Sequence, residues 1–85
     1  MHSPELSPIQ LTDLSVGQSG ELVLEPGGET PKRLRELGFV AGTCVTVVRF
    51  GAMGDPIELE LRGYRICLRR QDLSGLQVLP RKATA

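Results

Sequence analysis

An alternating run of apolar and charged residues near the middle of the chain limits the fold more than any other feature. In residues 57–61 isoleucine and leucine alternate with glutamate, and an alternation of the same period resumes in residues 65–69. This period of two is typical of strands that bury one face. Gly63-Tyr64 separates the two runs, and a two-residue loop with glycine first is typical of a type II′ hairpin turn. The sequence therefore predicts a β-hairpin with Leu61 opposite Ile66 and Leu59 opposite Leu68.

The rest of the chain consists mainly of short strand-like segments between turn-forming residues, with 10 glycines and 6 prolines in all. Only residues 30–38 have helical spacing, with Thr30 as the expected N-cap and Gly38 as the expected stop. We expect a mainly β fold of about five or six short strands, with one short helix inserted near residues 30–38. A small SH3-like barrel fits this pattern, with an OB-like barrel as the related alternative, because closure removes most exposed strand edges.

At 85 residues the chain can form one small domain and is too short for a doubly wound nucleotide fold or a TIM barrel. We expect flexible tails at residues 1–8 and 81–85, which lack an apolar pattern, around a domain at residues 9–80. No apolar run reaches the roughly 18 residues of a membrane helix, and no signal-peptide pattern is visible. The expected location is therefore the cytoplasm.

Several kinds of chemistry are disfavoured by the residues present. The only histidine is His2, in the expected N-terminal tail, so a histidine-based catalytic or metal-binding set cannot form within one chain. Cys44 and Cys67 have no second cysteine beside either, which fits two reduced thiols better than a disulfide framework or a zinc site. Glu58 and Glu60 are interpreted as surface charge-pair partners. We therefore expect no enzyme activity, no cofactor and no resident metal.

The charges are balanced overall and unevenly distributed. Ten lysines and arginines cancel ten aspartates and glutamates. Residues 1–31 nevertheless hold five acidic and no Lys or Arg side chains, whereas residues 61–85 hold six Lys or Arg side chains and one acidic side chain. The favoured interpretation is that these two halves pair within the folded chain, and the alternative is a basic docking face. Because the net charge is zero and aromatic residues are few, no nucleic-acid binding is expected.

Four ordered motifs make the chain similar to a known family. They are Leu11–Gly17 (LTDLSVG), Leu37–Thr43 (LGFVAGT), Met53–Ile57 (MGDPI) and Ile66–Leu73 (ICLRRQDL). Together they resemble the FeoA family of ferrous iron transport accessory proteins, over residues 9–80. Ala41 stands where members often have proline, a change that a turn can accommodate.

The resemblance implies an SH3-like barrel that works in the cytoplasm with FeoB, the membrane ferrous iron transporter that carries a GTP-binding domain. It also implies docking on the cytosolic region of that transporter, modulation of its assembly or GTP-linked activity, and neither catalysis nor a bound cofactor. The expected oligomeric state of the chain itself is a monomer or a weak dimer.

Three alternatives stay open at this point. A nucleic-acid-binding small β-barrel would use the C-terminal arginines, and a small metal-binding or redox protein would use Cys44, Cys67 and the carboxylates. A metal-responsive regulatory module is the third, since a similar domain is the last domain of the metal-dependent repressors. In those repressors the domain follows a winged helix and a dimerisation domain, for which this chain has no room.

The candidate partner-binding residues are of the types enriched at protein interfaces and lie on the expected helix, turn and loop. Helix, turn and loop can share one side of a small barrel. Each candidate also has a purely structural interpretation, as core, as a cap of the barrel or as a solvated charge. The candidates are Arg33, Arg35, Phe39, Val40, Met53 and Tyr64.

Overall fold

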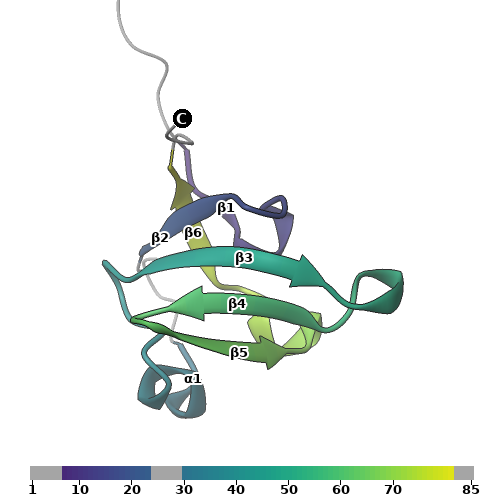
Figure 1. The fold of residues 1–85 in the computed structure, drawn as a ribbon. Helices are drawn as coiled ribbons and strands as arrows, with labels where there is room; N and C mark the ends of the chain where they lie inside the picture. Colours follow the sequence, from purple (N-terminus) through teal and green to yellow (C-terminus); the bar gives the residue numbers. More distant parts are fainter. Residues whose placement is uncertain (1–6, 24–29, 82–85) are drawn as a thin grey trace, which may run out of the picture.

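The computed structural model describes residues 7–23 and 30–81, which form one curved antiparallel sheet and one short helix (Figure 1). The sheet has six strands in the order β1-β6-β2-β3-β4-β5. The strands are β1 (Ile9–Gln10), β2 (Ser19–Val23), β3 (Cys44–Phe50), β4 (Ile57–Leu61), β5 (Tyr64–Leu68) and β6 (Gln77–Pro80). The helix is α1 (Lys32–Glu36), and single 3-10 turns lie at η1 (Leu11–Asp13), η2 (Ala52–Gly54) and η3 (Arg70–Leu73). The expected mainly β fold, with one short helix near residues 30–38, is confirmed.

The predicted tails lie largely outside the described residues. The sequence also favours a strand at residues 21–25, and the last two of these residues lie outside the described residues as well. Within residues 7–23 and 30–81, no helix has both the length and the apolar character needed to cross a membrane.

The hairpin predicted from the alternating pattern is formed by β4 and β5, but the predicted register is wrong by two residues. Leu59 pairs with Ile66, and Leu61 pairs with Tyr64. The turn is Arg62-Gly63, whose φ angles of 50° and 87° are those of a type I′ turn with glycine second. The predicted register would have placed Arg62 opposite Arg65, whereas the observed register places Arg65 opposite Glu60. A shift of two residues keeps every side chain on its face, so the expected buried face survives.

The helix is shorter than the segment that predicts it and begins differently. Its N-cap is Pro31, without a side-chain cap hydrogen bond, so the predicted capping by Thr30 is wrong. Pro31 takes the extended backbone of an N-cap (ψ 143°), and its carbonyl accepts hydrogen bonds from the first turn. Gly38 ends the helical segment with φ 107°, as expected for a left-handed stop.

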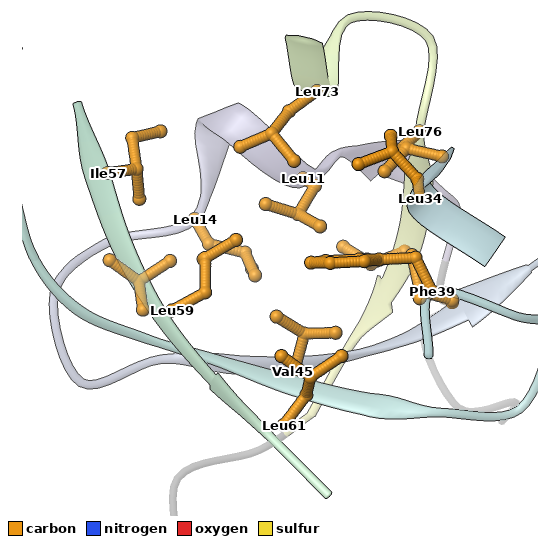
Figure 2. Packing of buried hydrophobic residues seen from close by; sticks show 13 residues of the cluster. Leu11, Leu14, Leu34, Phe39, Val45, Ile57, Leu59, Leu61, Leu73 and Leu76 are labelled. Carbon is orange, nitrogen blue, oxygen red and sulfur yellow. The ribbon is translucent and has the colours of Figure 1, made fainter. Parts of the chain in front are cut away.

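One apolar cluster fills the space enclosed by the sheet, the helix and the 3-10 turns. Figure 2 shows the flat ring of Phe39 reaching into the middle of this cluster, among Leu11, Leu34 and Val45. The cluster takes side chains from every layer of the fold, so helix, turns and sheet are stabilised together. Its buried members are Leu11, Leu14, Leu22, Leu34, Phe39, Val45, Val47, Ile57, Leu59, Leu61, Leu73, Leu76 and Val78.

Candidate functional site

The helix and the β4–β5 turn meet at one end of the molecule (Figure 1). The Tyr64 hydroxyl, at the start of β5, donates a hydrogen bond to the carbonyl of Leu37, just after α1. The side chain of Arg62 also lies close to Gly38, where an added Cβ would be 2.8 Å from the Arg62 Cδ. Two segments that are distant in sequence therefore form one continuous surface.

We call the exposed side chains at this end the helix–hairpin surface: Arg33, Arg35, Val40 and Tyr64. Val40 is 39% exposed and Tyr64 is 38% exposed. The Arg33 Nη2 lies 3.1 Å from a carboxylate oxygen of Asp72 in η3. The Arg35 Nε donates a 3.1 Å hydrogen bond to the carbonyl of Thr30. Because residues two apart on a helix point in different directions, the two arginines flank α1 rather than stand side by side.

Phe39 does not belong to this surface, and its prediction as an exposed contact is wrong. Its side chain is 1% exposed. Phe39 N–H donates to the Leu34 carbonyl, and the left-handed Gly38 turns the chain back so that the ring enters the core. An aromatic ring offers the largest apolar area in this part of the chain, so burial outweighs exposure.

Met53 is fully exposed but lies at the opposite end of the sheet, at the tip of the β3–β4 loop (Figure 1). The five residues of β4 separate this loop from the β4–β5 turn, a length of about 17 Å. The expectation that helix, turn and loop share one side is therefore wrong for the loop.

Arg70 holds that loop in place, a role that the sequence pattern did not predict. Its Nε donates to the Gly54 carbonyl at 2.6 Å, and its Nη1 donates to the Thr12 carbonyl at 3.1 Å. Its guanidinium also lies 5.0 Å from the centre of the Phe50 ring, in a cation–π contact. These contacts join η3 to two segments far away in sequence, so no local pattern could have predicted them.

A ladder of charges covers the outer face of β3, β4 and β5. The Arg49 Nε lies 2.6 Å from one oxygen of Glu58, and Arg65 lies 3.9 Å from the other and 3.8 Å from Glu60. The interpretation of Glu58 and Glu60 as surface pair partners is confirmed, and their partners are Arg49 and Arg65. Within the described residues, no group of three or more histidine, cysteine, aspartate or glutamate side chains is placed to hold a metal ion.

The two cysteines are free thiols at opposite ends of the sheet. Cys67 in β5 lies opposite Glu58 in β4, and Glu58 lies opposite Arg49, near the end of β3. Cys44 is the first residue of β3. The register therefore separates the two cysteines by about 16 Å along β3 and by two strand spacings, too far for a disulfide or a shared metal ion.

The interpretation that the acidic and basic halves of the chain pair with each other is not supported among the described residues, where no ion pair joins residues 7–23 or 30–31 to residues 61–81. Hydrogen bonding to Cys44, and then the charges of Cys44 and Glu21, raise the pKa of Arg81. The ion pairs found in the part of the chain that the structure describes all join residues between Lys32 and Asp72.

The curved six-stranded antiparallel sheet with one short helix defines a small SH3-like module. The FeoA domain model matches residues 9–80, and the chain belongs to the FeoA family.

Among known proteins, the Fe(2+) transport protein A/Fe(2+) transporter FeoB fusion protein of Porphyromonas gingivalis is 34% identical over 71 residues. That match covers 82% of this chain and 8% of the fusion protein, so this chain corresponds to a small part of that relative.

Solved structures of family members share the fold. The solution structure of FeoA from Chlorobium tepidum is 34% identical, with a TM-score of 0.69, over 84% of this chain and 69% of that one. The crystal structure of Stenotrophomonas maltophilia FeoA complexed with zinc is described as a procaryotic SH3 domain protein. It is 27% identical, with a TM-score of 0.69, over 87% of this chain and 96% of that one. The predicted SH3-like fold is confirmed.

A manganese-dependent transcriptional repressor also matches, with a TM-score of 0.73 at 13% identity, over 89% of this chain and 43% of that one. At this identity the likeness concerns the fold alone.

Proposed function

We propose that this chain is a non-catalytic accessory protein of a ferrous iron uptake system, which docks on the cytosolic region of a FeoB-type transporter. Docking modulates the assembly or the GTP-linked activity of the transporter. The observation that carries the proposal is the relative in which a similar domain and a FeoB transporter form one chain. Such a link keeps two modules at a high effective concentration, which is useful when they act on each other.

The helix–hairpin surface supports docking because its exposed side chains are held in place before a partner arrives. Tyr64 is tied to Leu37, Arg33 to Asp72 and Arg35 to Thr30, each by a hydrogen bond or an ion pair. Side chains that are already ordered lose less conformational entropy on binding. Tyrosine and arginine are also the residue types enriched at the centres of interfaces.

The basic residues near the C-terminus give little support to nucleic-acid binding. Arg70 is engaged by backbone carbonyls, and Arg65 lies against Glu58 and Glu60. Two of these charges are therefore already engaged within the chain, which leaves fewer to neutralise the phosphates that provide most of the affinity for nucleic acids.

The proposal is tested by titrating folded variants against the purified transporter. We expect Arg33→Glu or Arg35→Glu to weaken binding by roughly tenfold, as for an interface residue worth about 1–2 kcal/mol. Met53→Ala, at the opposite end of the sheet, is the matched exposed control and should bind like the wild type. Single-stranded oligonucleotide at low salt serves as the negative control.

The outcomes separate the docking function from its surface. If the wild-type protein does not bind the transporter, the proposed function fails. If both arginine variants bind like the wild type while Met53→Ala binds weakly, the loop end is the docking surface and the helix–hairpin surface is not.

A further inference from the structure

Strand β5 forms an open edge of the sheet. It is the last strand in the sheet order and pairs only with β4 among the described residues. Leu61 and Tyr64 flank the two-residue turn and therefore form a hydrogen-bonded pair, after which hydrogen bonding alternates along the strand. Ile66 thus bonds to β4, whereas the N–H and C=O groups of Arg65 and Cys67 point away from the sheet.

Nothing in residues 7–23 and 30–81 occupies these outward groups. Figure 1 shows β5 as the outermost strand beside β4, with α1 near one of its ends. The opposite edge, β1, is only 2 residues long, and β5 has 5 residues in unbroken register without a proline or a bulge. The usual devices that block strand addition, apart from charge, are therefore missing from β5.

The charges along this edge select the kind of strand that can be added. Arg62 and Arg69 stand at the two ends of β5 and make no ion pair within the described part of the chain. Arg65 lies between them on the outer face. A second copy of this chain would bring the same arginines together, so an acidic strand is the complementary partner.

The two faces of β5 differ, which defines a pattern for the added strand. Ile66 and Leu68 are half-buried and pack against the core, whereas Arg65 and Cys67 are exposed on the other face. An added strand would place its apolar side chains beside Ile66 and Leu68, and its carboxylates near Arg65 and Arg69. A segment that alternates acidic and apolar residues fits both faces.

We propose that the β5 edge binds an extended acidic segment of a partner protein as an additional strand of the sheet. The inference rests on the proposed function for the identity of the partner, which is then the cytosolic region of the transporter. The edge begins at Tyr64, so the added strand would continue directly from the helix–hairpin surface.

Amide hydrogen exchange measured by NMR tests the edge without the transporter. In the free protein we expect the Arg65 and Cys67 amides to exchange much faster than those of Ile66 and Leu68. A peptide of alternating glutamate and valine should protect the Arg65 and Cys67 amides, and added salt should weaken the effect. The matched control is a peptide of alternating lysine and valine, which should protect neither amide.

Substitution of Cys67 separates the backbone group from the side chain. Cys67→Pro removes an N–H that does not bond to β4, so the hairpin should persist, as proline is tolerated on edge strands. It should weaken binding of the glutamate–valine peptide and of the transporter by about tenfold or more, because a donor is lost and the proline ring obstructs the added strand. Cys67→Ser keeps the N–H and should bind like the wild type. Arg69→Glu should weaken binding of the same peptide and of the transporter through its charge alone. This variant replaces Cys67→Pro in the test if Cys67→Pro does not fold.

Three results would overturn the proposal. The first is no protection of the two amides by the glutamate–valine peptide, and the second is equal protection by both peptides. The third is a wild-type dimer in sedimentation that Cys67→Pro abolishes, which would make a second copy of the chain the occupant of the edge.

The transporter experiment separates this proposal from the proposed function. If wild type, Cys67→Ser, Cys67→Pro and Arg69→Glu bind the transporter equally, the β5 edge is excluded as the docking site of the transporter while the proposed function stands. If the transporter binds none of them, the proposed function fails, and the peptide experiment alone decides whether the β5 edge binds an acidic strand.

Discussion

Truncating Phe39 to alanine should destabilise the fold strongly, because this ring lies in the middle of the core. The side chain is 1% exposed and packs in the cluster that joins the helix, the 3-10 turns and the sheet (Figure 2). Removing a buried aromatic ring costs about 3–5 kcal/mol through lost transfer free energy and the cavity left behind. A domain of 85 residues has a free energy of unfolding of about 4–13 kcal/mol, so the variant loses a large share of its stability.

Equilibrium urea unfolding of wild type and Phe39→Ala measures this loss directly. With a denaturant slope of about 1–3 kcal/mol per molar urea, the midpoint should fall by at least about 1 M. Val40→Ala is the adjacent control. Val40 is 39% exposed, and its truncation should change the free energy of unfolding by less than about 1 kcal/mol.

The same variant separates a core role from a contact role. If Phe39 acts through packing, the folded fraction of Phe39→Ala should bind the transporter like the wild type under stabilising conditions. A change of less than about 1 kcal/mol in the free energy of unfolding, together with a loss of binding, would refute the assignment of Phe39 to the core.

Three further predictions concern the hairpin turn, the β3–β4 loop and the thiols. Arg62→Asn should raise the free energy of unfolding by about 0.5–1 kcal/mol, because asparagine before glycine tolerates the left-handed φ of this type I′ turn. A loss of stability in thermal unfolding would contradict the observed register. Arg70→Ala should lower the free energy of unfolding by about 2–4 kcal/mol, and Arg70→Lys should restore little of it, since an ammonium lacks the planar fork that reaches two carbonyls. Full stability of Arg70→Lys in urea would show that charge alone matters there. Thiol titration should find two free groups in denatured protein, with Cys67 reacting before Cys44 in the folded state because Cys67 is the exposed one. A missing thiol, or the reverse order, would contradict this placement.

The strands, the helix and the fold class were predictable because they depend on local patterns. Alternation in residues 57–61 defines a half-buried strand wherever that strand lies in the fold, and glycine at position 38 ends a helix by its own backbone freedom. The motifs that resemble the FeoA family also depend only on residue order, and the match over residues 9–80 confirms that resemblance.

The hairpin register was decided by interactions across strands. Two neighbouring two-residue turns, Arg62-Gly63 and Gly63-Tyr64, keep the same apolar face buried, so the pattern of apolar residues cannot choose between them. The choice depends on which charges then lie opposite each other, and the observed turn brings Arg65 opposite Glu60.

The candidate site was decided by tertiary structure for a related reason. Sequence chemistry selects residue types that suit an interface, but it does not state which way a side chain points or which end of the sheet it occupies. Phe39 became core because the chain reverses at Gly38, and Met53 was separated from Tyr64 by the length of β4. The anchoring of Arg70 and the open edge of β5 depend on segments that meet only after folding. The sequence by itself therefore determined the elements and the family, whereas long-range packing alone decided which residues form a surface.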